Sequence, residues 1–530
     1  MRVSRLKALR VGVAMLFFAL IALVFLDFHN LVAPAIAKGL LFPQFVPSLL
    51  QYVNTVALGA SGFIVVIVLT LLFGRVYCST LCPLGTLQDM IGLVARRKRK
   101  RYGFHYSKPH TALRYTILAL TVLLLLSGSG LLLNLLDPFS SFGRITANLF
   151  RPVVLFVNNL AAVTLEQWEV YALPRVRWAV FSPVAAGVSL ATLLLVAWLA
   201  ASRGRLYCNT ICPVGTLLGL FARISWLRIG INPDSCKGCS LCEDVCKAGC
   251  IDSRQKTVDS SRCVGCFNCL TVCHKNGLHF ENNWRRRPPA NGPDQERRVF
   301  LLSSGVFLLG LAPLPEPTKA IIQSKPTTVA EQVTCPTSPP GSGSITHFTA
   351  ACTACHLCVS ACPSRVLAPS LFEFGFKGIM QPRMNFHTGY CNYECTICME
   401  VCPSGALVPL GVEKKKLTQL GVAKFIKENC VVFTDNTACG ACSEHCPTKA
   451  VDMVPYVNPN ANPAGPANKD LKIPEMKPDY CIGCGGCEHA CPTKPYKAIF
   501  VDGNPEHKLA KKPVVKKIEA SIDNNGGFPF

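Results

Sequence analysis

The sequence predicts an α-helical membrane domain, made of two two-helix repeats and a fifth span, joined to two small cysteine-rich α+β domains. Half of the 530 residues are apolar and the mean hydropathy is +0.32, which is too apolar for a wholly soluble chain of this length. The 30 cysteines recur in tight runs, unlike the scattered cysteines of a short secreted disulfide scaffold.

Four apolar stretches are close to the roughly 20 residues that a helix needs to cross the hydrocarbon core. They lie at about 11–28, 56–73, 116–136 and 179–201. Segments 31–50 and 148–165 are also apolar, but prolines or polar residues interrupt them, so we expect interfacial or re-entrant pieces there. These assignments make residues 1–227 a four-helix membrane domain.

The formal net charge of +23 is concentrated near the apolar segments, because basic and acidic residues are nearly balanced over 316–530. This distribution indicates membrane topology and no nucleic-acid partner. Two basic clusters favour the cytoplasmic side: the run from Arg96 to Arg101, and the start of the chain at Arg2, Arg5, Lys7 and Arg10. We therefore expect a cytoplasmic N terminus.

The membrane domain contains an internal repeat: the motif over 74–87 reappears over 204–217, and both copies contain Tyr-Cys-x3-Cys-Pro. Each copy follows a predicted span and emerges at the inner face, so the two cysteine pairs should lie close together. The sequence leaves open whether they form a redox-active dithiol set, a further metal site, or thiols that only pack against helix ends. The pairs are Cys78 with Cys82 and Cys208 with Cys212.

Residues 228–283 form a cysteine-dense domain with two C-x2-C-x2-C-x3-C runs. In a [4Fe-4S] cube such a triplet binds three corners and a distant cysteine supplies the fourth. Zinc motifs usually come as C-x2-C pairs with a longer spacer, which disfavours a pair of zinc sites. Cys250 is a spare thiol. The expected ligands are Cys236, Cys239, Cys242, Cys246, Cys263, Cys266, Cys269 and Cys273.

Residues 351–510 form a second iron–sulfur domain with four runs, each closed by a proline. The gaps after Cys391 and Cys430 are longer than in the simple run, so looser geometry is expected there. Cys352 to His356 also matches the C-x-x-C-H haem attachment motif, but a haem would strand two cysteines of that run. The expected ligands are Cys352, Cys355, Cys358, Cys362, Cys391, Cys395, Cys398, Cys402, Cys430, Cys439, Cys442, Cys446, Cys481, Cys484, Cys487 and Cys491, and the chain should hold about six [4Fe-4S] clusters in all.

A connecting segment over 284–350 separates the two cysteine-rich domains. It begins with a basic linker, and Glu296 to Leu302 resembles a twin-arginine export signal. An ordinary span over about 299–313 explains the same residues, and either one would carry the rest of the chain across the membrane. A Pro-, Ser- and Gly-rich linker follows, and a basic tail over 511–530, expected to be disordered, closes the chain.

The paired motif and the following two-run domain resemble NapH/MauN-type membrane polyferredoxins, and NosR-type and CcoG-type proteins share the paired motif. Residues 297–500 resemble NapG/MauM-type ferredoxins, through Pro339-Pro340-Gly341 and the run from Cys398 to Leu407. The resemblance implies that the fourth ligands cross over in the first domain, Cys273 to the first triplet and Cys246 to the second. Four-cluster ferredoxin subunits suggest pairing of the first run with the fourth and the second with the third, with neighbour pairing left open.

The resemblance implies a quinol dehydrogenase component in a bacterial inner membrane. It would pass electrons from the quinone pool to a periplasmic reductase or cytochrome, with quinol as substrate and the four-cluster domain in the periplasm. No residue pattern for acid–base or nucleophilic catalysis is apparent. The alternative is a cluster-bearing assembly or regulatory factor for another membrane redox complex.

Overall fold

The computed structural model describes residues 3–29, 31–55, 61–98, 104–176, 182–274, 277–282, 329–457 and 471–512. The chain divides into two compact units. The membrane unit comprises Met1–Pro326, Ser338–Thr388 and Thr396–Leu410, and the C-terminal unit comprises Thr327–Thr337, Gly389–Cys395 and Gly411–Phe530. The twin-arginine-like segment, the fifth span and the tail beyond residue 512 lie outside the described residues.

The expected domain over 351–510 is thus divided between the two units. Its first part packs with the helices of the membrane unit, because α18 (Leu357–Ala361) contacts α1 (Val3–Leu26) and α17 (Ile345–Ala351) contacts α3 (Phe45–Thr55). The expectation of one separate four-run domain is therefore corrected.

Three helices in the described residues are long and apolar enough to cross a membrane, judged by length and composition. They are Ser4–Leu26 of α1, the continuous helix Pro138–Glu166, and α11 (Pro183–Arg203). The second joins α9 (Pro138–Ile145), the π-helix η2 (Thr146–Phe150) and α10 (Arg151–Glu166). There are also two shorter apolar helices: α4 (Gly62–Phe73) falls within the second predicted span, and α7 (Thr111–Leu126) overlaps the first half of the third.

Residues 148–165, predicted as an interfacial or re-entrant piece, instead belong to the continuous 29-residue helix Pro138–Glu166, which is long and apolar enough to cross a membrane. Pro152 lies in the first turn of α10, directly after the π-turn of η2. Proline has no backbone N–H to donate and would normally interrupt a helix. Here the π-turn just before it changes the hydrogen-bond register, and the helix continues past the proline.

Large apolar side chains on the long helices face outward from the protein. Leu16 of α1, Val153 of α10 and Trp198 of α11 are 58%, 60% and 68% exposed. Such exposure is costly in water and favourable in lipid, where the surrounding chains are equally apolar. The helices therefore have the surface of membrane-spanning segments, and the protein is membrane-bound.

The internal repeat appears as the same order of elements twice. In the first copy α4 ends at Phe73 and is capped by Gly74, α5 (Tyr77–Thr80) carries the first cysteine, and Pro83 begins α6 (Pro83–Lys98). The second copy has the corresponding elements α11, α12 (Leu206–Thr210) and α13 (Pro213–Arg223). Gly74 and Gly204 have φ of 74° and 69°, a conformation that glycine adopts readily and that stops each helix.

The remaining elements of the membrane unit are short. The N-terminal part adds α2 (Pro34–Leu41) and α8 (Leu131–Leu136). The first cysteine-rich module contains β1 (Leu227–Ile231), α14 (Leu241–Asp244), β2 (Ile251–Asp252), β3 (Thr257–Val258), α15 (Asn268–Val272) and β4 (Leu278–Asn282). Strand β1 pairs antiparallel with β4, and β2 with β3. The later segment contains β5 (Leu367–Pro369), η4 (Phe376–Gly378), β6 (Pro382–Met384) and α19 (Ile397–Glu400), with β5 antiparallel to β6.

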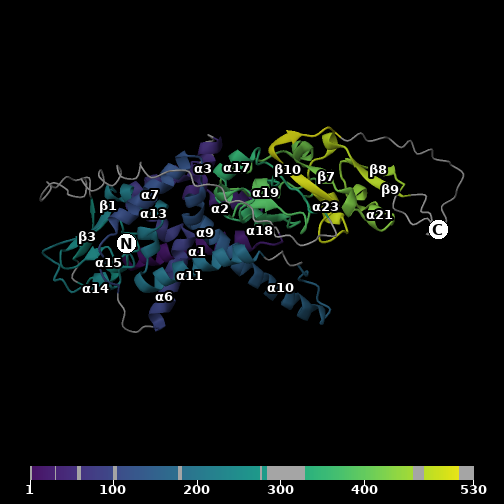
Figure 1. Cartoon of the computed structure of the whole chain (residues 1–530). Coiled ribbons are helices and arrows are strands. Elements are labelled where there is room, and N and C mark those ends of the chain that lie inside the picture. The colour runs from purple at the N-terminus through teal and green to yellow at the C-terminus, as the bar shows by residue number, and fades with distance from the viewer. Residues whose placement is uncertain are drawn as a thin grey trace. The chain divides into compact units, whose positions relative to one another are not determined.

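The C-terminal unit is built on two antiparallel strand pairs (Figure 1). Strand β7 (Thr418–Phe425) pairs with β10 (Ile499–Leu509), with a register shift between Gly503 and Lys508. Strand β8 (Val451–Pro455) pairs with β9 (Lys472–Met476). The connections carry the cysteines on or beside α20 (Val412–Leu417), η5 (Lys427–Asn429), α21 (Val431–Thr434), α22 (Ala441–Glu444), η6 (Pro478–Tyr480) and α23 (Gly486–Ala490).

Candidate metal centres

A backbone motif recurs in four cysteine runs: the residues directly before and after the middle cysteine both have positive φ. They are Gly238 and Ser240, Gly265 and Phe267, Ala354 and His356, and Gly483 and Gly485. Left-handed residues are uncommon outside glycine and indicate a constrained turn. The two flanking turns curl the peptide around the middle cysteine. The runs that begin at Cys391 and Cys430 lack this pair among the described backbone angles, in keeping with their irregular spacing.

A second left-handed residue follows the last cysteine of four runs by three positions: Gly249, Arg365, Gly405 and Lys449. The first of these follows Cys246, where Lys247 stands in the position that a proline occupies after the last cysteine of the other three runs. The turn is therefore kept at Cys246 without the proline.

In the first module, Cys246, Cys263, Cys266 and Cys269 line one apolar cavity, together with Cys250. The crossover that brings Cys246 to the second triplet is thus present in the geometry. Cys242 lies close enough to Cys236 and Cys239 for their charges to interact. Beyond Cys273 the chain returns to the first triplet. Gly277 lies so close to Cys236 that a Cβ added to the glycine would be 3.4 Å from the Cα atom of Cys236.

In the later part of the membrane unit, the first triplet meets the last cysteine of the next run. Cys358 is in electrostatic contact with Cys352, Cys355 and Cys402. Cys352 and Cys402 also belong to one apolar cluster centred on Phe348 and Met399. The set Cys352, Cys355, Cys358 and Cys402 has the form of a three-plus-one cluster site.

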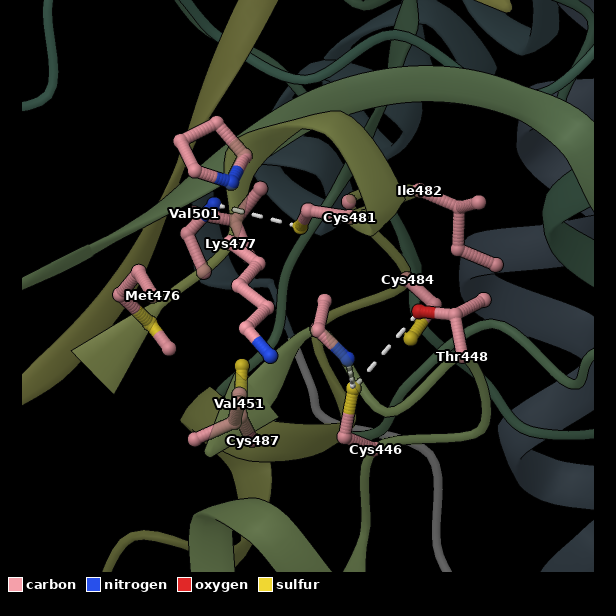
Figure 2. A pocket seen from close by; sticks show the side chains of 15 residues that line it. Cys446, Thr448, Val451, Met476, Lys477, Cys481, Ile482, Cys484, Cys487 and Val501 are labelled. Atoms are coloured by element: carbon pink, nitrogen blue, oxygen red, sulfur yellow. Dashed lines mark hydrogen bonds between the residues drawn. The ribbon is translucent and has the colours of Figure 1, made fainter. Parts of the chain in front are cut away.

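The C-terminal unit contains two further sets of the same form. Cys446 faces Cys481, Cys484 and Cys487 across a cavity (Figure 2). Backbone amides donate to two of these sulfurs, Ala450 N to Cys446 Sγ at 3.2 Å and Ala423 N to Cys481 Sγ at 3.4 Å. Such bonds to sulfur are among the features that tune cluster potentials. The other set lines a second cavity and consists of Cys430, Cys439, Cys442 and Cys491.

These sets correct the preferred pairing of the runs. The first run joins the second through Cys402, and the third and fourth runs exchange Cys446 and Cys491. Each exchange joins runs that are neighbours in the sequence, so pairing of the first run with the fourth is wrong.

Neither zinc nor haem fits these residues. Among the described residues no three cysteine sulfurs lie within 4.8 Å of one another, whereas a tetrahedral zinc with bonds of about 2.3 Å would bring them within about 3.8 Å. His356 is buried, with Nδ1 3.0 Å from Asn148 Nδ2 and Nε2 2.8 Å from the Met380 carbonyl. Burial lowers the pKa of His356 to about 4, so the ring is neutral and both nitrogens are engaged.

The four cysteines of the internal repeat come together in the core of the membrane unit, as predicted. Cys78, Cys82, Cys208 and Cys212 are between 2% and 4% exposed and belong to one buried cluster. Cys212 is in electrostatic contact with the other three. We call these four residues the core quartet.

Two buried arginines, one from each repeat, cross between the halves of the core quartet. Arg75 donates to the carbonyl of Cys208 at 3.0 Å, and Arg205 donates to the carbonyl of Cys78. The glycine two residues after each Cys-Pro pair leaves room for this, since a Cβ on Gly85 would lie 2.6 Å from Arg205 and one on Gly215 would lie 2.8 Å from Arg75. Asp89 binds Arg205 at 2.8 Å and Lys247 at 3.0 Å.

Neither these arginines nor Asp89 were predicted from the sequence. The signal was present, because Arg75 and Arg205 occupy the same position of the repeated motif. No sequence signal identifies Asp89, whose partners come from distant segments.

Two family models match the chain. A 4Fe-4S binding domain matches residues 55–102 and 185–232, and a 4Fe-4S dicluster domain matches 351–406 and 437–494. The first pair of segments contains only the core quartet cysteines. The second pair agrees with neighbour pairing of the runs. The chain is a ferredoxin-type electron transport protein with 4Fe-4S binding domains.

Curated relatives include an uncharacterized protein of Methanocaldococcus jannaschii, 28% identical over 41% of this chain and 68% of its own length. The putative electron transport protein YccM of Escherichia coli is 25% identical over 46% of this chain and 59% of its own length. The ferredoxin-type protein NapH of Haemophilus influenzae is 26% identical over 42% of this chain and 67% of its own length. These similarities confirm the resemblance to the NapH/MauN type. No solved structure matches the chain.

Proposed function

We propose that this protein takes electrons from membrane quinol and passes them through its clusters to a periplasmic acceptor, a reductase or a cytochrome. The 24 cysteines of the six runs would hold six [4Fe-4S] clusters, which supply one-electron steps. The core quartet would add a further redox or metal site. The residues of the chain hold and space these groups and shield them from water.

The main support is the position of two cysteine sets at opposite ends of α1. Near its start, Lys7 Nζ lies 3.5 Å from Thr271 of α15, within the first module. Near its end, Phe25 packs on Gly143 of α9. The carbonyl of Cys355 approaches the same glycine. Lys7 and Phe25 are 18 positions apart, or about 27 Å along a helix, close to the roughly 30 Å of a hydrocarbon core. The basic N terminus favours the cytoplasm for the first module.

A cavity beside the first module suits the quinol ring. It is lined by Phe73 at the end of α4, by Phe267 and Phe280 with ring centroids 5.7 Å apart, and by Cys263. Quinone-like ligands need an apolar, largely aromatic pocket with a few polar groups. Arg228, bound to Glu281 at 2.7 Å, is one such polar group of the cavity. Oxidation of one quinol would release two electrons to the clusters and two protons to the solvent.

Filling this cavity tests the quinol site. Replacing Ser260, which lines it, by Trp should slow cluster reduction by a menaquinol analogue at least tenfold, because the indole occupies the space of the ring. Dithionite should still reduce the clusters at the normal rate. Gln255→Trp, an exposed change in the same module, is the control. Equal quinol rates in both variants would show that quinol does not bind there.

A further inference from the structure

We infer that the core quartet holds one [4Fe-4S] cluster, a seventh centre that connects the first module with the cysteine set around Cys355. The role of this cluster in electron transfer rests on the proposed function. Its assignment to these four cysteines rests on the residues around them. Four thiolates are the number that one cube requires, and each Cys-x3-Cys-Pro loop supplies two.

Polar donors are directed at the quartet sulfurs. Gln88 Nε2 lies 3.3 Å from Cys208 Sγ, and the backbone N–H of Gly215 donates to Cys212 Sγ at 3.3 Å. Arg75 lies 3.9 Å from Cys78 Sγ. Thiols that only fill space among apolar helices do not require such donors, whereas the sulfurs of a cluster accept them.

The charges of the site call for an anion. The guanidinium of Arg75 is fully buried, and no carboxylate forms an ion pair with it in the part of the chain that the structure describes. Its contacts are the Asn209 side chain, two carbonyls and Cys78 Sγ. A buried cation without a counter-charge is strongly unfavourable. A cluster with four thiolates carries about two negative charges when oxidised and would supply the counter-charge that Arg75 needs.

A redox-active dithiol pair explains the same residues less well. Thiol–disulfide exchange requires that a partner thiol reach the sulfur. All four quartet cysteines are at most 4% exposed, and the two loops close over them from both sides.

The quartet loops touch the first module on one side. Arg75 donates to the Ser261 carbonyl at 3.0 Å, and Asn209 donates to the Ala248 carbonyl at 3.0 Å. Val76 packs on Gly265, whose added Cβ would lie 3.3 Å from the valine side chain. These contacts join the quartet to the loops that carry Cys246, Cys263 and Cys266.

On the other side the quartet is joined to the set around Cys355 through α8 and α9. The hydroxyl of Tyr207, the residue before Cys208, donates to the Leu136 carbonyl at 2.9 Å. Asp137 caps α9 by accepting from Ser140 N at 2.8 Å. Arg144 of the same helix lies 3.4 Å from the carbonyl of Ala354. Electron tunnelling slows exponentially with distance, so a centre at the quartet would divide one long gap into two shorter ones.

Iron counting on the purified full chain tests the assignment. We expect about 28 irons per chain in place of the about 24 of six clusters. Cys208→Ala and Cys82→Ala should each lower the content by about four irons and remove the same electron paramagnetic resonance signal. Cys335→Ala, which changes a thiol outside every set, is the control. Unchanged iron content in Cys208→Ala would overturn the inference, whatever the electron donor proves to be.

A second variant separates a cluster site from a merely structural one. Arg75→Gln removes the charge and keeps only two N–H donors. It should lower the midpoint potential of the quartet signal while the iron content stays normal. Gel filtration and the unchanged signals of the first module report folding. A quartet signal whose potential does not move would contradict the role given to Arg75.

Discussion

Replacing Cys402 by Ala is expected to abolish the same cluster as replacing Cys355 by Ala. The two cysteines lie 47 positions apart but belong to one set with Cys352 and Cys358. Losing one of four thiolates leaves the cube without a corner, so one spectroscopic signal and about four irons should disappear in either variant. Electron paramagnetic resonance of the reduced chain and iron analysis provide the measurement.

The double variant should lose no more than either single variant, because both changes act on one cluster. Cys491→Ala is the matched comparison, and it should remove the different signal that depends on Cys430, Cys439 and Cys442. If Cys355→Ala and Cys491→Ala removed the same signal, the runs would pair first with fourth and the geometry described above would be wrong.

Asp89→Asn is expected to destabilise the membrane unit by about 3 kcal/mol or more, since breaking a buried pair leaves an uncompensated charge. The Asp89 side chain is 13% exposed, and it neutralises both Arg205, which is 1% exposed, and Lys247. Thermal or denaturant unfolding in detergent measures the loss. Asp234→Asn, at an exposed position, should change stability by less than about 0.5 kcal/mol.

The same pair predicts a pH dependence. Burial alone would raise the pKa of Asp89, but Arg205 and Lys247 outweigh it and hold the pKa well below its usual range. A depressed carboxylate pKa contributes stability that is complete above its unfolded value, about 3.9, and is lost as the pH falls further. The difference between wild type and Asp89→Asn should therefore be constant from pH 5 to 8 and shrink below about pH 4. A difference that grew on acidification would exclude this pair as its source.

Spacing in the sequence was enough to locate the cysteine runs and to predict that one run supplies three ligands of a set. A C-x2-C-x2-C triplet is local, so its geometry follows from a few backbone angles such as those of Gly265 and Phe267. The pairing of runs was predicted wrongly because the fourth ligand comes from a distant segment. The residues around Cys402 or Cys446 do not indicate which triplet that cysteine joins.

The membrane helices were predicted where apolar residues form an unbroken stretch, as in α1 and α11. The helix Pro138–Glu166 was missed because Pro152 and the polar residues near it suggest an interruption, while the π-turn that accommodates the proline depends on local packing. The close approach of the four quartet cysteines was predicted from the repeat. The contacts of Arg75 and Arg205 with the opposite copy could not be predicted, because they depend on how the two copies pack against each other.

The most direct test of the account is quinol-driven electron transfer across sealed liposomes that contain the full chain. An impermeant acceptor, ferricyanide, is added to one side at a time while a menaquinol analogue is supplied in the membrane. We predict that ferricyanide is reduced only on the side from which added protease cleaves the C-terminal unit, and that Cys208→Ala abolishes this activity. Absence of quinol-driven reduction in the wild type, with all clusters present, would contradict the account and favour an assembly or regulatory role.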